Sequence, residues 1–118
     1  MFKMIVKVWC LAEKEEAELK EIHKSIVSVL TGRKRIGVRN QRDLLVLFPP
    51  DLMSYGLGSE ILIEVTFIQE LRHETQEVFD GVSYALEDFI DNFYHMDTRV
   101  ACLVESFDGK FRSRCFSH

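Results

Sequence analysis

A short polar stretch of this sequence gathers five basic side chains, and these are the residues best suited to bind an anion. They are Arg33, Lys34, Arg35, Arg39 and Arg42. Arginine binds carboxylate and phosphate through charge-assisted, often bidentate hydrogen bonds, so one interpretation is a small-anion site. The alternative is a solvated loop whose charges only face water. For the anion site, Arg33 is the first candidate ligand, with Arg35 or Arg39 in support.

The other residues that could take part in catalysis or metal binding are isolated from one another in the sequence. Glu64 interrupts an apolar stretch, and we expect it to reach a rim or to pair with an arginine; a catalytic carboxylate in a pocket is the alternative. His73 and Glu77 are spaced i,i+4 but have no evident third ligand for a metal. No Ser-His-Asp order, phosphate-binding loop or dinucleotide fingerprint is present. The sequence therefore predicts no metal and no cofactor.

The elements that must position these residues form the same pattern twice. Four apolar stretches predict β-strands: Met4–Cys10, Leu44–Phe48, Ile61–Ile68 and Val100–Val104. Between the strands of each pair, apolar residues recur at spacings of three and four, which predicts an amphipathic helix. The first helix ends at Gly32 and a polar connection, 33–43, follows. The second helix runs from about Leu71 to Phe93, and a close approach of helix to sheet would explain Gly81 inside it.

Two β-α-β units predict an α/β (α+β) fold in which four strands form one mixed sheet, with both helices on one face. A crossover connection makes the two strands of each unit parallel. Met4–Cys10 and Ile61–Ile68 carry apolar groups on both sides, which is typical of buried, central strands. The face without helices then leaves apolar groups in water, and association of sheets from several copies is the simplest remedy.

A single domain over residues 1–118 is predicted, with pseudo-repeats at about 1–50 and 59–107 and a C-terminal hairpin at 99–116. The dipeptide Asp108-Gly109 predicts the hairpin, because it is among the strongest two-residue turn signals. We expect the last strand, Phe111–Phe116, to pair with another strand, and a strand of a second subunit is one option.

Composition and charge exclude several classes of protein. Hydrophobic residues make up 47% of the chain and charged residues 29%, as in ordinary globular proteins. A net charge of −4 argues against nucleic-acid binding, which needs a basic face. Three cysteines without a C-x-x-C spacing indicate free thiols in a reducing compartment. Since neither a signal peptide nor a membrane-spanning apolar run is visible, we expect a cytoplasmic protein without a membrane partner.

Three stretches carry motifs of a known family: the opening Met1–Val6, then Thr31-Gly32-Arg33, and the loop from Pro50 to Glu60 with its Pro-Asp and Met-Ser-Tyr-Gly. They resemble the tautomerase superfamily, and within it the macrophage migration inhibitory factor type, with two β-α-β units per chain. The resemblance implies a homotrimer whose three sheets form a central barrel. It also implies isomerase chemistry, in which an N-terminal proline, neutral near pH 7, is the base for enol or keto substrates. Cationic side chains then hold the substrate carboxylate.

The chain departs from this family at the catalytic position. Position 2 is Phe2 rather than proline, and we expect Met1 to be retained because its removal generally needs a small second residue. The primary amine of Met1 is then only a weak candidate base, displaced by one residue. Ala101 and Leu103 also stand where the inhibitory-factor type has polar pocket residues. Arg33 matches the family's lysine and is the remaining candidate ligand for the carboxylate.

Three functions stay open. The first is a tautomerase-like protein without proline-based activity that binds a small carboxylate or serves as a scaffold. The second is an isomerase of the same fold that acts on a small keto or enol carboxylate with a different base. The third is a dimeric, ferredoxin-like ligand-binding domain, because the element order fits that fold as well. The substrate-binding candidates are Phe2, Arg33, Arg35, Arg39 and Glu64.

Overall fold

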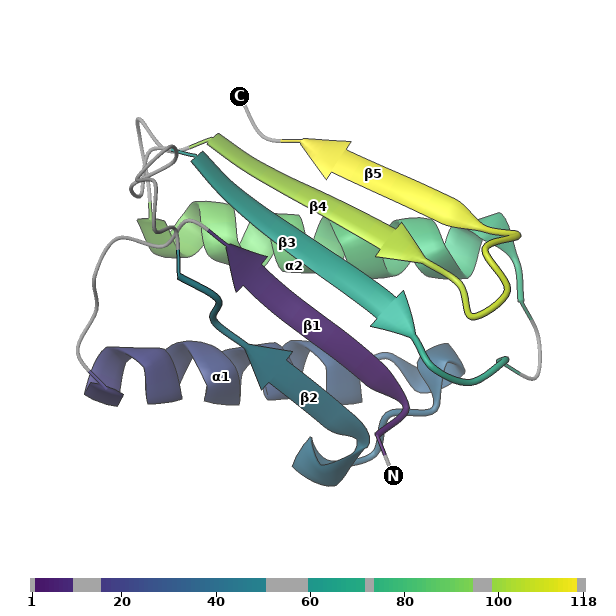
Figure 1. Cartoon of the computed structure of the whole chain (residues 1–118), viewed down its shortest axis with the longest axis horizontal. Helices are drawn as coiled ribbons and strands as arrows, with labels where there is room; N and C mark the ends of the chain where they lie inside the picture. Colours follow the sequence, from purple (N-terminus) through teal and green to yellow (C-terminus); the bar gives the residue numbers. More distant parts are fainter. Residues whose placement is uncertain (1, 10–15, 51–59, 72–73, 95–98, 117–118) are drawn as a thin grey trace.

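The computed structural model of the chain describes residues 2–9, 16–50, 60–71, 74–94 and 99–116. They form an α+β fold of two helices packed on one five-stranded mixed sheet (Figure 1). The strands are β1 (Met4–Trp9), β2 (Leu44–Leu47), β3 (Glu60–Phe67), β4 (Arg99–Glu105) and β5 (Arg112–Phe116). The helices are α1 (Glu16–Thr31) and α2 (Gln76–Tyr94), with two 3-10 turns, η1 (Lys34–Ile36) and η2 (Gln41–Asp43), before β2.

The sheet confirms the two predicted β-α-β units. Its strand order is β2-β1-β3-β4-β5, in which β1 runs parallel to β2 and β3 runs parallel to β4. The two units meet where β1 and β3 pair antiparallel, with Val6 opposite Val65. These two strands are central, as their apolar character predicts. Because the strands of each unit pair directly, the arrangement differs from the split β-α-β unit of a ferredoxin-like domain.

The prediction of a four-stranded sheet is wrong by one strand. Within residues 99–116, the last strand is β5, which lies in the same sheet and pairs antiparallel with β4 of its own chain. Gly109 has a φ of 72° in the turn, a left-handed angle that glycine adopts without strain. Asp108 Oδ1 accepts hydrogen bonds from Lys110 N and Ser106 Oγ, both at 3.0 Å. The hairpin thus adds a fifth strand at the edge of the sheet.

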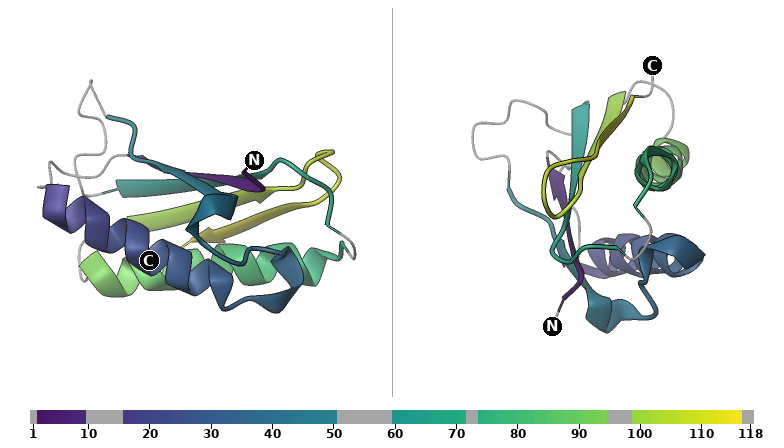
Figure 2. Two further views of the ribbon diagram at one scale, coloured as in Figure 1. Left: turned by 90° about the horizontal axis from the view of Figure 1, so that it is seen from below. Right: turned by 90° about the vertical axis from the view of Figure 1, so that its right-hand side faces the viewer.

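Both helices cover the same face of the sheet (Figure 2). Alternate strand residues point toward them and are buried, beginning with Met4, Val6 and Val8 of β1. The helices contribute their apolar stripes, including Ile22, Ile26 and Leu30 of α1 and Phe79, Val82, Leu86 and Ile90 of α2. In the described residues no helix covers the opposite face. We call it the uncovered face.

Two segments differ from their predicted form. The second helix begins at Gln76 rather than near Leu71, because Thr75 caps it: its Oγ1 and its carbonyl oxygen accept from Val78 N at 3.4 and 3.1 Å. The connection 33–43 is not merely polar, since Ile36 and Val38 are only 2% and 4% exposed and join the core. These two side chains anchor the connection in the core.

Candidate functional site

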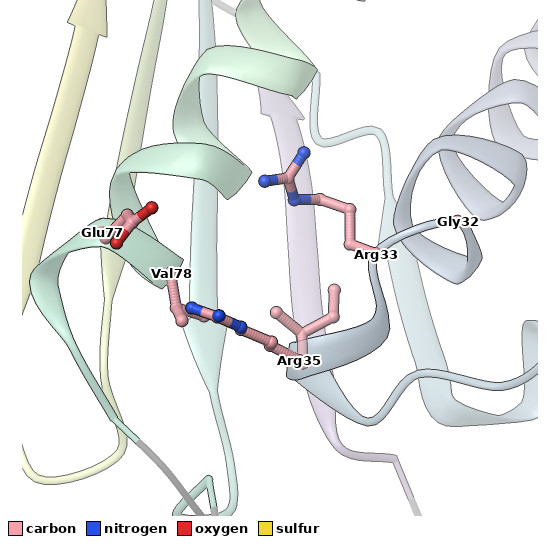
Figure 3. Close-up of a pocket in the computed structure, with 6 residues that line it drawn as sticks. Gly32, Arg33, Arg35, Glu77 and Val78 are labelled. Atoms are coloured by element: carbon pink, nitrogen blue, oxygen red, sulfur yellow. The ribbon is translucent and has the colours of Figure 1, made fainter.

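A cavity of about 360 Å³ lies where the end of α1 faces the start of α2. Its lining residues come from both sides of this gap (Figure 3): Gly32, Arg33, Arg35, Ile36, Glu77 and Val78. The chain leaves α1 through Gly32, whose N–H donates to Ser28 O at 3.2 Å, and Arg33 N donates to Leu30 O at 3.1 Å. The next residues form η1, so Arg33 and Arg35 both lie shortly after the end of α1.

Arg33 reaches from the end of α1 across to α2 (Figure 3). Its guanidinium lies against Gly81, since a Cβ atom at that position would overlap Nη2 of Arg33 and lie 3.1 Å from its Cζ. From the sequence, we expect a close approach of the helix to the sheet at Gly81. In the structure, the group that approaches Gly81 closely is instead the Arg33 side chain. A glycine inside a helix is itself a local signal in the sequence, as the basic cluster is for Arg33 and Arg35.

Arg35 enters the same cavity from η1. Its guanidinium points toward Val78 at the start of α2 (Figure 3). The neighbouring Ile36 is buried and anchors the turn. Gly37 follows with a φ of 73°, and its carbonyl oxygen accepts from Lys3 Nζ at 3.0 Å. The structure therefore brings Arg33 and Arg35 together on a turn that is anchored at both ends.

The charges of the cavity favour a bound anion. Within the described ranges, neither Arg33 nor Arg35 has a carboxylate at ion-pairing distance. Glu77 lines the cavity as well, but it is an exposed residue and forms no ion pair with either arginine. Two guanidinium groups facing one cavity are suited to hold carboxylate or phosphate oxygens.

Two other predicted site residues, Phe2 and Arg39, do not line this cavity. Phe2 is 40% exposed and precedes β1, where Lys3 N donates to Asp43 O at 2.8 Å. Arg39 is exposed, and its backbone N–H donates to Asp43 Oδ2 at 2.9 Å. That hydrogen bond is the chief reason why the pKa of Asp43 lies below its usual value. Of the two arginines predicted to support Arg33, Arg35 lines the cavity and Arg39 does not.

Glu64 lies away from this site, on the uncovered face. In register it stands between Lys7 of β1 and Leu103 of β4. It lines a separate hollow of about 270 Å³, together with Arg112 and Arg114 of β5. Glu64 therefore does not share a cavity with Arg33.

Some predictions fall outside the described residues. They concern Met1 as a candidate base, His73 as half of a metal pair, Cys10, and the loop motif between Asp51 and Ser59. Across the part of the chain that is described, no group of three histidine, cysteine, aspartate or glutamate side chains is placed to hold a metal ion. Nor is either described helix long and apolar enough to cross a membrane.

Comparison of the chain with known proteins does not assign it to a family. No protein-family model matches the chain, and no curated protein matches it. What is shown is a small α+β domain with two β-α-β units. Membership of the tautomerase superfamily stays a prediction from the sequence motifs.

Proposed function

We propose that this chain is a tautomerase-like protein without the catalytic proline, and that it binds a small carboxylate between Arg33 and Arg35. The observation that carries the proposal is the placement of both guanidinium groups at one cavity, without a carboxylate partner among the described residues. The arrangement of two β-α-β units with both helices on one face supports the family, since the resemblance leads to the same arrangement.

The proposal assigns no proline-based catalysis to the chain. Phe2 stands where the family has proline, and its backbone nitrogen is an amide that cannot accept a proton at neutral pH. Its exposed side chain does not line the cavity of Arg33. A carboxylate bound there is thus held without the family's base beside it.

A binding measurement tests the proposal. Calorimetric titration with succinate, with uncharged succinamide as the control ligand, should give saturable binding of succinate alone. A charge-assisted hydrogen bond to a carboxylate contributes about 1.5–3 kcal/mol, so Arg33→Ala should weaken binding roughly tenfold or more. Arg42→Ala is the matched control, because Arg42 is exposed, carries the same charge and lies outside the cavity. Equal affinities in the two variants would remove Arg33 from the site.

The isomerase alternative needs a base at the same cavity. Among the cavity's lining residues the carboxylate is Glu77, whereas Glu64 lies on the uncovered face. We expect the native chain to show no phenylpyruvate enol–keto conversion above the uncatalysed rate. Conversion at a rate typical of the family that disappears in Glu77→Gln would support the isomerase instead.

A further inference from the structure

Gly81 occupies a position where glycine is unfavourable. It lies inside α2, and glycine lowers the stability of a helix interior relative to alanine. Its backbone does not require glycine, since the positive-φ glycines of the described chain are Gly37 and Gly109. The reason for a glycine at this position must therefore lie in the space beside it.

That space is filled by the end of the Arg33 side chain. The three atoms nearest to a Cβ at Gly81 all belong to Arg33: Nη2, which the Cβ would overlap, Cζ at 3.1 Å and Nε at 3.6 Å. No backbone atom of the sheet or of α1 is among them. Only a residue without a side chain leaves the guanidinium this close to the helix.

We infer that Gly81 is a positioning residue of the anion site, where its missing side chain holds the Arg33 guanidinium against α2 at the cavity. The inference rests on the proposed function, because it takes Arg33 as the anion ligand. A free arginine side chain loses considerable rotamer entropy when it is fixed. Contact with α2 restricts it before the anion arrives, and such preorganisation raises affinity.

Alanine at this position should move the arginine and leave the helix intact. The atoms that the new methyl group meets are the far end of a flexible side chain, so the guanidinium can swing away. The helix itself should gain, since alanine is the best helix former. Gly81→Ala should thus change the position of the Arg33 guanidinium without impairing the folding of the chain.

The test is a double-mutant cycle of Gly81→Ala and Arg33→Ala, with two measurements on all four proteins. For succinate affinity, we expect Gly81→Ala to weaken binding roughly tenfold when Arg33 is present, and to cause no further loss in the Arg33→Ala background. For the melting temperature, we expect Gly81→Ala to add roughly 4 °C in the Arg33→Ala background and clearly less when Arg33 is present.

Each contrary outcome has its own meaning. Equal gains in melting temperature in both backgrounds would show that Arg33 does not lie on Gly81, and would overturn the inference. Succinate binding by Gly81→Ala that is as tight as in the native chain would overturn it as well. If the melting temperatures are coupled but Arg33→Ala binds succinate normally, the contact exists and the proposed function is wrong.

Discussion

Cys102 and Cys115 show how neighbouring groups set the chemistry of a single residue. They face each other across β4 and β5, and both are free. Burial raises the pKa of the Cys102 thiol, and it is also the first cause that raises the pKa of Cys115. The carboxylate of Glu87 adds to the effect on Cys115, whose Sγ donates to Glu87 Oε2 at 3.6 Å. The thiolate, which is the reactive form, is therefore disfavoured at both sites.

We predict slow thiol chemistry in the folded protein. In a Cys10→Ser background, Cys102 and Cys115 should react with an aromatic disulfide reagent at pH 8 far more slowly than in the denatured chain. Glu87→Gln should speed the reaction of Cys115, because it removes a negative charge that disfavours the thiolate. The absorbance of the released thiol measures both rates. Native thiols that react as fast as denatured ones would contradict this prediction.

At the scale of elements, a polar network joins α2 to the edge strand β5. The Asp80 carboxylate accepts from Ser113 Oγ at 2.6 Å and from Gln76 Nε2 at 2.9 Å. Gln76 also donates to Arg112 O at 2.7 Å, and Ser83 Oγ lies 2.7 Å from Ser113 Oγ. The hydrogen bond from Ser113, followed by that from Gln76, lowers the pKa of Asp80.

This network predicts a dependence of stability on pH. Because the pKa of Asp80 is lower in the folded chain than in the unfolded one, its stabilisation is complete above the unfolded value of about 3.9 and is lost as pH falls through the folded value. Urea unfolding at pH 6 and pH 3 should therefore show a larger loss for the native chain than for Asp80→Asn. The pKa values of Asp43 and Asp108 are also lowered, but they affect both proteins alike. Equal losses in the two proteins would count against the network.

The elements also show what sequence patterns can predict. Periodicity is local, so both β-α-β units, the central place of β1 and β3, and the hairpin were predictable. The position of β5 in the sheet depends on how the hairpin packs, and the start of α2 depends on the Thr75 cap. Neither follows from apolar spacing alone.

The candidate site was predictable only in part. Arg33 and Arg35 follow from local charge and from the resemblance. Glu77 and Val78 line the same cavity, although more than forty residues separate them from Arg35 in the sequence. No local sequence pattern predicts that they lie at this cavity. Arg39, only four residues beyond Arg35, lies outside the cavity because η1 and the buried Ile36 and Val38 turn the chain away.

At the scale of the whole molecule, the uncovered face exposes apolar side chains that another molecule could cover. Apolar side chains from all five strands point to it: Ile5, Trp9, Leu45, Leu47, Leu62, Ala101, Leu103 and Phe116. Trp9 Nε1 is buried there without a hydrogen-bond partner. We propose that this face is covered by further copies of the chain, in the homotrimer that the family resemblance implies.

The proposed homotrimer can be tested by measuring the molecular mass of the native protein by light scattering. The native chain should have a mass about three times 13.8 kDa. Phe116→Glu should lower that mass, because it places a charge on the uncovered face, where Phe116 is 60% exposed in the single chain. Tyr84→Glu is the matched control, since Tyr84 is 63% exposed on α2. A native monomer would contradict the trimer, and a native dimer would favour a different assembly.

The proposed anion site between Arg33 and Arg35 can be located directly by one measurement. The side-chain Nε–Hε signals of the arginines can be followed by NMR while succinate is added to ¹⁵N-labelled protein. The structure predicts saturable shifts at Arg33 and Arg35 and little change at Arg39 and Arg42, which lie outside the cavity. Shifts that never saturate, or that spread evenly over all the arginines, would contradict the anion site.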